Sequence, residues 1–358
     1  MIYGANGYTG RLVTEIAVAK GLKPVLAGRN KEAIVTMAKH YKLPYQICAL
    51  DDKNALSDAV LGVNVVLHCA GPFVHTVKPM LEACLRNGTH YLDITGEIAV
   101  FEKLAELNEA ITTAGIMAMS GVGFDVVPTD CLSLYLKEQL PSASYLSLAF
   151  MSTGGGVSHG TATTMLHSFD QGGAIRKNGV ITKVPHAHKT RLVNFRSRRR
   201  PVKCVTIPWG DVATAYHSTG IPNIEVYTAL GKWGMRFLEL SEGMFGWLFK
   251  RDFLRNFIQN RINNAPAGPS ARQRSRAQSY IWGEAIDGKG NKVTARLITP
   301  EGYTLTALTA LKIVEKVLAG NAPIGYQTPA KAYGAGLILE IEGVSREDVS
   351  LQREISIE

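Results

Sequence analysis

The chain has 358 residues, 46% of them apolar and 19% charged, and its formal net charge is +9 at pH 7. This length exceeds what one hydrophobic core usually organises, so we expect two domains. No apolar run approaches the roughly 20 residues needed to span a bilayer, and no secretory leader is recognisable, so we expect a cytoplasmic protein. The first 121 residues are nearly neutral, and the positive charge therefore belongs to the rest of the chain.

In chain order, the first feature is a short strand that breaks into a helix at a glycine-rich turn. Only Met1 to Tyr3 precede this turn, so either the first strand is unusually short or the chain start lies a few residues upstream. Glycines spaced GxxGxxG let backbone amides approach a pyrophosphate without obstruction by side chains. The expected cofactor-binding residues of the turn are Gly4, Asn6, Gly7, Tyr8, Thr9 and Gly10.

The second strand, over 24–27, ends in Gly28-Arg29-Asn30 rather than in an acidic residue. A domain that binds NAD usually presents Asp or Glu here to the ribose hydroxyls. Arg29 can instead pair with a 2′-phosphate, and Asn30 can donate to it. We therefore expect NADP as the cofactor. The alternative is that these residues form only a solvated turn and a helix N-cap.

Strand and helix patterns then alternate up to residue 122. Further strands are expected over 45–50, 63–69, 90–94 and 116–120, with helices over 31–41, 55–61, 77–87 and 99–114 between them. With the first two strands, this predicts an α/β fold in which residues 1–122 form a Rossmann domain with a doubly wound parallel sheet.

Ligands of such sheets bind at the carboxyl ends of the strands, where three turns carry candidate side chains. The turn after the fourth strand adds Cys69, Ala70, Gly71 and Pro72 to the expected cofactor-binding residues.

Hydride transfer also needs a proton donor, for which the candidates are Tyr91, Asp93, Asp125 and His159. Asp93 and Asp125 could equally be helix caps or turn residues, Tyr91 could simply pack within its strand, and His159 could be a solvated loop residue.

Residues 123–325 are expected to form a second, α+β domain for substrate binding and dimerisation. Strands over 277–285 and 291–299 are joined by a turn at 287–291, which predicts a mostly antiparallel sheet, and a helix follows over 305–318. Residues 326–358 are expected to return towards the Rossmann domain, with a final strand over 337–342.

The ordered segments GANGYTG, LAGRN, CAGPF, YLDITGE and GFDVVPTD resemble the saccharopine dehydrogenase-like NADP-binding family, particularly its trans-acting enoyl reductase-like branch. The resemblance implies an NADP-dependent oxidoreductase and a homodimer. The second domain has no recognisable cluster of cations for an amino-dicarboxylate, which favours reduction of a C=C or C=O group in an acyl or lipid-like substrate. A saccharopine-type dehydrogenase and a non-catalytic NADP-binding sensor or scaffold are the alternatives.

Two basic regions leave further alternatives open. Arginines over 196–200 lack the interleaved aromatic residues of a single-strand binding surface, so no nucleic-acid partner is expected. Residues 233–262 interleave aromatic and basic side chains, which suits either a helix in a membrane interface, with the protein at the membrane surface, or an ordinary helix pair covering a sheet. His186 and His188 lack nearby carboxylates or cysteines, and no metal site is expected.

Overall fold

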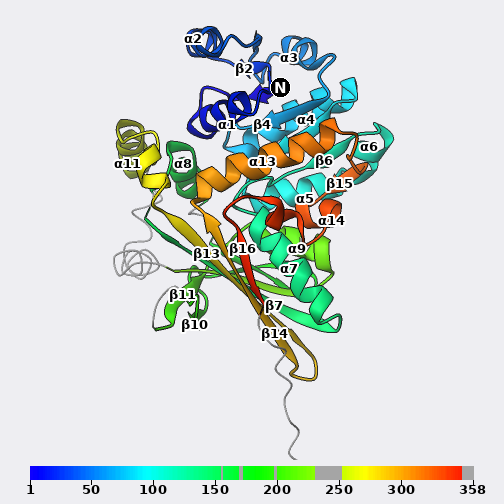
Figure 1. The fold of residues 1–358 in the computed structure, drawn as a ribbon, viewed down its shortest axis with the longest axis vertical. Helices are drawn as coiled ribbons and strands as arrows, with labels where there is room; N and C mark the ends of the chain where they lie inside the picture. The colour runs from blue at the N-terminus through cyan, green and yellow to red at the C-terminus, as the bar shows by residue number, and fades with distance from the viewer. Residues whose placement is uncertain (155, 169–171, 197–199, 230–251, 349–358) are drawn as a thin grey trace, which may run out of the picture. The chain divides into compact units, whose positions relative to one another are not determined.

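The computed structural model describes residues 1–358 except 155, 169–171, 197–199, 230–251 and 349–358 (Figure 1). The chain forms two compact units. The first contains Met1–Val127 together with Tyr303–Tyr333, and the second contains Pro128–Gly302 together with Gly334–Glu358. The expected borders lie after residues 122 and 325. In the structure the first unit extends to residue 127, and the chain returns to it at residue 303 and leaves it after residue 333.

The first unit contains a fully parallel sheet of seven strands in the order β15-β6-β5-β4-β1-β2-β3. The strands are β1 (Ile2–Tyr3), β2 (Leu26–Gly28), β3 (Tyr45–Ile47), β4 (Val65–His68), β5 (His90–Asp93), β6 (Met117–Met119) and β15 (Gly325–Gln327). Strands β1 to β6 are the six expected ones in the order of a doubly wound sheet. The expected Rossmann fold is confirmed, with a seventh strand added at one edge.

Helices connect these strands and bury one apolar side each. They are α1 (Tyr8–Ala19), α2 (Lys31–Tyr41), α3 (Lys53–Val60), α4 (Phe73–Asn87), α5 (Ile98–Glu106) and α6 (Asn108–Thr113), followed later by α13 (Gly302–Leu318) and α14 (Pro329–Tyr333). In α1, Leu12, Val13 and Ala17 are buried at helical spacing, whereas Arg11 and Glu15 are exposed. The central strands β1, β2, β4 and β6 are mostly buried apolar runs, as expected for a parallel sheet covered on both faces, whereas the edge strand β3 is largely exposed.

Strand β15 joins the sheet through contacts between residues far apart in sequence. It pairs in parallel with β6, and the side chain of Asn108 accepts a 2.7 Å hydrogen bond from the backbone N–H of Tyr326. On α13, the hydroxyl of Thr309 donates to the carbonyl of Val122 at 2.8 Å. These contacts explain why residues 303–333 belong to the first unit.

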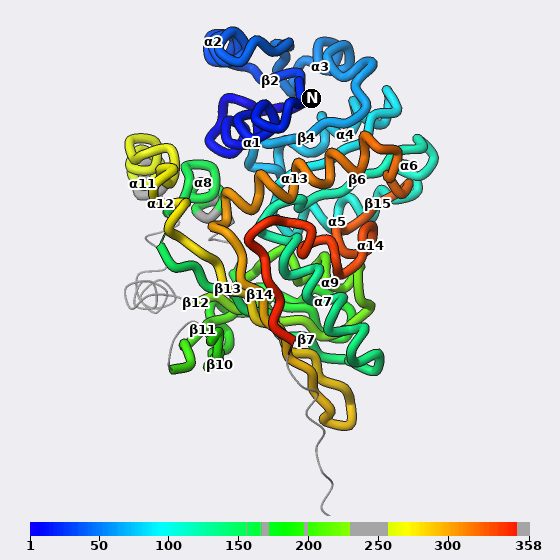
Figure 2. Tube along the Cα trace, in the orientation of Figure 1, coloured from blue at the N-terminus to red at the C-terminus, as the bar shows by residue number. Residues whose placement is uncertain are grey.

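The described part of the second unit contains a mixed sheet of nine strands. Figure 2 traces the course of the chain through this sheet as a tube. The helices of this unit are α7 (Val127–Gln139), α8 (His159–Ser168), α9 (Asp211–Thr219), α11 (Asp252–Asn264) and α12 (Ala271–Arg274). Its strands are β7 (Ala143–Thr153), β8 (Gly173–Lys177), β9 (Val180–Val184), β10 (Thr190–Val193), β11 (Val202–Thr206), β12 (Asn223–Ala229), β13 (Gln278–Asp287), β14 (Lys292–Pro300) and β16 (Ser345–Asp348). Within this second sheet, β12 and β7 form the one parallel pair among the described strands, which confirms a mostly antiparallel second sheet.

The hairpin of β13 and β14 forms as expected, but the end of the chain differs. The carboxylate of Asp287 accepts from the backbone N–H groups of Lys289 and Asn291 at 2.9 and 3.0 Å, which closes the turn. The expected strand over 337–342 is wrong, because Leu337–Glu340 forms a 3-10 helix with both Leu337 and Ile338 buried. The last strand is instead β16, which pairs with β14 and is labelled in Figure 1.

The aromatic and basic stretch over 233–262 is described only in part. Residues 233–251 lie outside the described residues, and the rest of the stretch belongs to α11. On this helix Phe257 is 52% exposed, and the guanidinium of Arg261 lies 5.8 Å from the centre of its ring. An exposed aromatic ring beside a cation is compatible with both of the alternatives that the sequence leaves open.

Candidate functional site

The glycine-rich turn between β1 and α1 requires glycine at two of its positions. Gly4 has a positive φ of 77°, and a Cβ there would lie 2.9 Å from the backbone nitrogen of Ala70. At Gly10, a Cβ would lie 2.3 Å from the carbonyl oxygen of Gly4 and 2.8 Å from the Cα of Ala5. The first turn of α1 therefore packs directly on the loop, as the spacing of the glycines predicts.

The N-terminus of α1 suits a pyrophosphate. Its N-cap is the exposed Gly7, which offers no capping side chain, and the first turn carries no acidic residue. The next two helices differ, because Asn30 caps α2 and Asp52 caps α3. An N-terminus without a side-chain cap leaves backbone N–H groups and the positive end of the helix dipole for an anion. The residues of the turn thus fit a dinucleotide.

Two aromatic rings meet beside this turn. Tyr8 and Thr9 are partly buried in the first turn of α1. The ring of Tyr8 meets the ring of Tyr303 edge to face, with centroids 5.0 Å apart and planes at 83°. Tyr303 starts the segment that returns to the first unit, and its contact with the nucleotide turn has no local signal in the sequence.

The end of β2 presents the side chains expected near the adenosine ribose. A Cβ at Gly28 would lie 3.2 Å from Oδ1 of Asn6, so this amide packs against the end of the strand. Arg29 is exposed. Asn30 is the N-cap of α2, where its Oδ1 accepts from the backbone N–H of Ala33 at 3.0 Å. The cap uses only the oxygen of Asn30, and its Nδ2 is a donor that the cap does not use.

Arg11 adds a second cation that the sequence reasoning missed. Its Nε donates to the carbonyl of Asn6 at 2.9 Å, which ties the guanidinium to the glycine-rich turn. Arg11 and Asn30 both line an open cavity of about 620 Å³ whose other lining residues belong to α1 and α2. Because Arg11 is the first residue after the glycine motif, it could have been considered as a phosphate contact on position alone.

The turn between β4 and α4 is held by a side chain of α4, that of Thr76. Cys69, Ala70 and Pro72 are partly buried and Gly71 is exposed, with a cis peptide bond between Gly71 and Pro72. The hydroxyl of Thr76 donates to the carbonyl of Ala70 at 2.7 Å. The turn is therefore fixed close to Gly4, on the same side of the sheet as the glycine-rich turn.

Glu97 caps α4 from the following loop. Its two carboxylate oxygens accept from the backbone N–H groups of Phe73 and Val74, each at 2.8 Å. A carboxylate at a helix N-terminus satisfies orphan donors and interacts favourably with the helix dipole. Glu97 is the last residue of the segment YLDITGE, and the sequence alone gives it no role because its partners lie 23 and 24 residues away.

His68, at the end of β4, is a neutral buried side chain. Burial lowers its pKa to about 3, and its Nε2 lies 3.0 Å from the hydroxyl of Thr76. Since that hydroxyl donates its own hydrogen to Ala70, His68 must donate from Nε2. The ring also lies 5.4 Å from the rings of Tyr3 and Phe73. His68 therefore supports the turn that precedes α4.

Asp93 and Tyr91 form a fully buried network at the end of β5. The carboxylate of Asp93 accepts from the hydroxyls of Ser120 at 2.7 Å and Tyr91 at 2.8 Å. It also accepts from the backbone N–H groups of Thr95 at 2.9 Å and Gly121 at 3.1 Å. Burial raises the pKa of Asp93 to about 6, against the lowering effect of these hydrogen bonds.

Neither side chain of this network reaches the surface, since the exposed fraction of both residues is 0%. Burial also raises the pKa of Tyr91 well above its usual value. This placement argues against direct proton transfer from Asp93 or Tyr91 to a substrate. Their hydrogen bonds instead fix the loops that follow β5 and β6 against each other.

Asp125 is only partly buried, and it lies in the loop after β6. A Cβ on Gly96 would lie 2.7 Å from Oδ2 of Asp125, so the carboxylate faces the loop after β5. Burial raises its pKa to about 7. Among the described residues no hydrogen bond or ion pair holds this carboxylate. The backbone beside it is fixed, because Phe124 donates its N–H to the hydroxyl of Thr306 at 3.0 Å.

His159 belongs to the second unit, at the start of α8. Its Nε2 lies 2.7 Å from the carbonyl oxygen of Ala265, and its backbone N–H donates to the carbonyl of Ala267 at 3.2 Å. The ring thus helps to hold α8 beside the segment after α11. Tyr91, Asp93 and Asp125 share the first unit, and His159 is not one of this group.

Within the described ranges, no three His, Cys, Asp or Glu side chains gather in a way that would hold a metal ion. In the same part of the chain, no helix combines the length and the apolar character needed to cross a membrane.

Comparison with known proteins gives the family of the first unit. Residues 1–119 match the family model of the saccharopine dehydrogenase NADP binding domain. A saccharopine dehydrogenase-like oxidoreductase of Mus musculus is 26% identical over 202 residues, which are 49% of this chain and 47% of that protein. The chain thus matches about half the length of this relative.

Two other relatives extend the comparison. A lipid droplet localized protein of Caenorhabditis elegans is 23% identical over 348 residues, which cover 83% of this chain and 80% of that protein. A trans-acting enoyl reductase of Mycobacterium leprae is 32% identical over 146 residues, which cover 38% of this chain and 34% of that protein.

One solved structure of another protein shares the fold over nearly the whole chain. The apo structure of saccharopine dehydrogenase (L-Glu forming) from Saccharomyces cerevisiae covers 98% of this chain and 99% of its own, with a TM-score of 0.63 and 12% identity. At this identity the likeness shows the fold alone. Together with the glycine-rich turn and the open N-terminus of α1, the family match assigns a nicotinamide dinucleotide to the first unit. Residues 1–119 therefore match the saccharopine dehydrogenase NADP-binding domain, and about half of the chain is similar to saccharopine dehydrogenase-like oxidoreductases.

Proposed function

We propose that the protein is an NADP-dependent reductase of a C=C or C=O group in an acyl or lipid-like substrate. The preference for NADP rests on Arg29, which is exposed after β2 where an NAD-binding domain usually carries an acid. Arg11 and Asn30 line a neighbouring cavity and supply further donors for a 2′-phosphate. The names of the nematode and mycobacterial relatives, a lipid droplet localized protein and a trans-acting enoyl reductase, support a lipid-like substrate and an enoyl group.

The proposed proton transfer rests on Asp125, whose partly exposed carboxyl has a raised pKa. A carboxyl with a pKa near 7 is protonated in about half of the molecules at neutral pH and can act as a general acid. When bound, the nicotinamide supplies a hydride to the electrophilic carbon of the acceptor. The carboxyl of Asp125 gives its proton to the α-carbon of an enoyl group or to the oxygen of a carbonyl, and it is reprotonated from water afterwards.

The buried groups around Asp125 have a positioning role in this proposal. Asp93, with donors from Tyr91, Ser120, Thr95 and Gly121, holds the loops after β5 and β6. Glu97 and Thr76 hold the turn before α4 in the same way. Rigid loops keep the acid and the nicotinamide in one geometry, which contributes to catalysis through orientation.

The experiment measures NADPH oxidation with an α,β-unsaturated acyl thioester and with an aliphatic aldehyde, between pH 6 and pH 9. We expect turnover that falls as the pH rises through about 7, because the acid loses its proton. Asp125→Asn should lower kcat by about 10² or more. The matched control is Asp58→Asn, which removes an exposed carboxylate from the same unit and should leave the rate unchanged.

The outcomes separate the alternatives. NADPH binding without turnover of either acceptor would favour a sensor or scaffold. Reduction of NADP⁺ in the presence of saccharopine, with no oxidation of NADPH by either acceptor, would favour an amino-acid dehydrogenase. Equal rates for wild type and Asp125→Asn would remove Asp125 from the mechanism while leaving the reductase in place.

The proposal also includes the setting of the enzyme. We place it in the cytoplasm, at a lipid surface contacted through residues 233–262, and as a homodimer formed by the second unit. The exposed Phe257 beside Arg261 and the name of the nematode relative support the lipid surface.

A further inference from the structure

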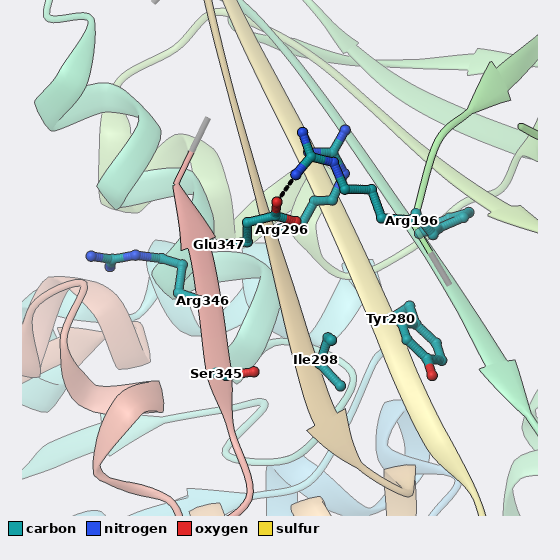
Figure 3. Close-up of a pocket in the computed structure, with 8 residues that line it drawn as sticks. Arg196, Tyr280, Arg296, Ile298, Ser345, Arg346 and Glu347 are labelled. Carbon is teal, nitrogen blue, oxygen red and sulfur yellow. Dashed lines mark hydrogen bonds and ion pairs between the residues drawn. The ribbon is translucent and has the colours of Figure 1, made fainter. Parts of the chain in front are cut away.

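The second unit contains a cavity of about 310 Å³ whose lining includes none of the candidate nucleotide-binding or catalytic residues. Figure 3 shows it above the edge formed by β13, β14 and β16. Strand alternation points Ser345 and Glu347 to the side of Arg296 and Ile298, which are their direct partners on β14. Phe195 and Tyr280 add apolar surface to the lining.

Arg296 is a buried cation without a carboxylate partner among the described residues. Only 9% of the residue is exposed. Its Nε donates to the carbonyl of Asn194 at 2.7 Å, whereas its buried Nη1 has no hydrogen-bond partner within the described ranges. Burial, with the nearby charge of Arg196, lowers its pKa. An incompletely paired guanidinium in such a place costs free energy that an anion would offset.

Arg196 is held next to Arg296 by the same asparagine. The side chain of Asn194 accepts from the backbone N–H of Arg196 at 2.9 Å, and Arg196 adopts a positive φ of 56°. A non-glycine residue in this region carries strain that surrounding contacts must offset. Figure 3 shows the two guanidinium groups together, with the carboxylate of Glu347 forming an ion pair to Arg196. Two cations therefore face one carboxylate.

A third arginine in the cavity wall is already paired. The Nε of Arg346 donates to Asp348 at 2.8 Å, and its guanidinium lies 3.6 Å from the centre of the Tyr135 ring. In Figure 3 this side chain points away from the other two arginines, on the opposite face of β16. Arg346 is thus a matched control for the pair.

We propose that the cavity binds a phosphate group between Arg196 and Arg296, in the place that the carboxylate of Glu347 occupies. The oxygens of a tetrahedral phosphate can accept from two guanidinium groups in different planes, whereas the lone pairs of a carboxylate lie in one plane. Its charge of nearly −2 at neutral pH matches the two cations. The apolar lining by Phe195 and Ile298 suits the organic part of a phosphate ester or a phospholipid headgroup. This inference does not depend on the proposed reductase activity.

The test is calorimetric titration of the full-length protein with inorganic phosphate. Ionic strength is kept constant with chloride, and saturating NADP⁺ fills the nucleotide site. We expect one phosphate per chain. Arg196→Gln should weaken binding about tenfold or more, because one charge-assisted contact is lost, and Arg346→Gln should leave it within about twofold.

Glu347→Gln distinguishes a binding site from a structural ion pair. Removing the competing carboxylate should tighten phosphate binding several-fold if phosphate takes its place. Weaker binding in Glu347→Gln, or binding unaffected by Arg196→Gln, would overturn the proposal, as would the absence of saturable phosphate binding to wild type.

Two further titrations identify the source of the phosphate. Glycerol 3-phosphate competing with inorganic phosphate would indicate a soluble ester. Phosphatidylcholine vesicles containing phosphatidic acid, but not phosphatidylcholine alone, should retain wild type more than Arg196→Gln if the ligand is a lipid headgroup. Either result supports the phosphate site.

Discussion

Replacing Asp125 by Asn should make the first unit less sensitive to alkaline pH. Burial raises the pKa of this carboxyl from 3.8 to about 7, so the folded protein holds its proton more tightly than the unfolded chain does. The stability that this proton contributes is present below pH 3.8, and it is lost as the pH rises through about 7.

The magnitude follows from the same two pKa values. At about 1.4 kcal/mol per pH unit, the interval between 3.8 and about 7 corresponds to a loss of about 4 kcal/mol. Most of this interval lies above pH 5, so wild type should lose up to about 3 kcal/mol between pH 5 and pH 8 through Asp125. This is a ceiling, because the side chain is partly exposed and water stabilises its charged form.

The assay compares wild type and Asp125→Asn in urea at pH 5 and pH 8, with hydrogen exchange of peptides over 90–127 as the reading for the first unit. Between pH 5 and pH 8 the free energy of unfolding of wild type should fall more than that of Asp125→Asn, since Asn carries no titrating charge. Asp93 titrates in both proteins, so its effect cancels. The reasoning would be refuted if the free energies of unfolding of the two proteins differed by the same amount at both pH values, or if wild type gained stability relative to Asp125→Asn at pH 8.

Two further substitutions test the packing of the nucleotide turn. Gly10→Ala should destabilise the first unit by about 1–3 kcal/mol and weaken NADPH binding, because its Cβ would lie 2.3 Å from the backbone oxygen of Gly4. Urea unfolding and nucleotide titration measure both effects, and Gly288→Ala, which meets no atom within 4 Å, is the control that should change neither. Glu97→Gln should cost about 1–3 kcal/mol, since its amide nitrogen would face an N–H of α4 in place of an accepting oxygen; unchanged thermal unfolding would contradict the capping role.

The parts of the fold that could be predicted are specified by neighbouring residues. The glycine-rich turn needs small residues at fixed spacing, and buried parallel strands are short apolar runs between helices. The hairpin turn at 287–291 has the same local character, because Asp287 bonds to the backbone two and four residues ahead. Such features can be recognised without knowing the rest of the structure.

The features that were missed depend on partners far along the chain. Strand β15 has three residues and pairs with β6, which lies more than 200 positions earlier. In the segment over 337–342 only Leu337, Ile338 and Ile341 are buried, and so short an apolar pattern does not separate a strand from a short helix. Periodicity therefore gave the wrong element there.

The candidate site shows the same limit in its side chains. Asp93 ends strand β5 and Asp125 lies in the loop after β6, so their positions in the sequence make them equal candidates for the proton donor. Only the structure separates them, because Asp93 is fully buried among four donors whereas Asp125 is partly exposed without a bond among the described residues. Burial of a polar side chain depends on the whole packed unit, which local sequence does not specify.

The central claim is that the first unit binds NADP through Arg29. The most direct test titrates the protein with NADPH and with NADH, following nucleotide fluorescence, in wild type, in Arg29→Ala and in Arg86→Ala, which removes an exposed arginine elsewhere in the unit. We predict that Arg29→Ala weakens NADPH binding about 10- to 100-fold, the worth of one or more charge-assisted hydrogen bonds, while NADH binding and Arg86→Ala stay unchanged. Equal loss of both nucleotides in Arg29→Ala, or no binding of either to wild type, would contradict the account.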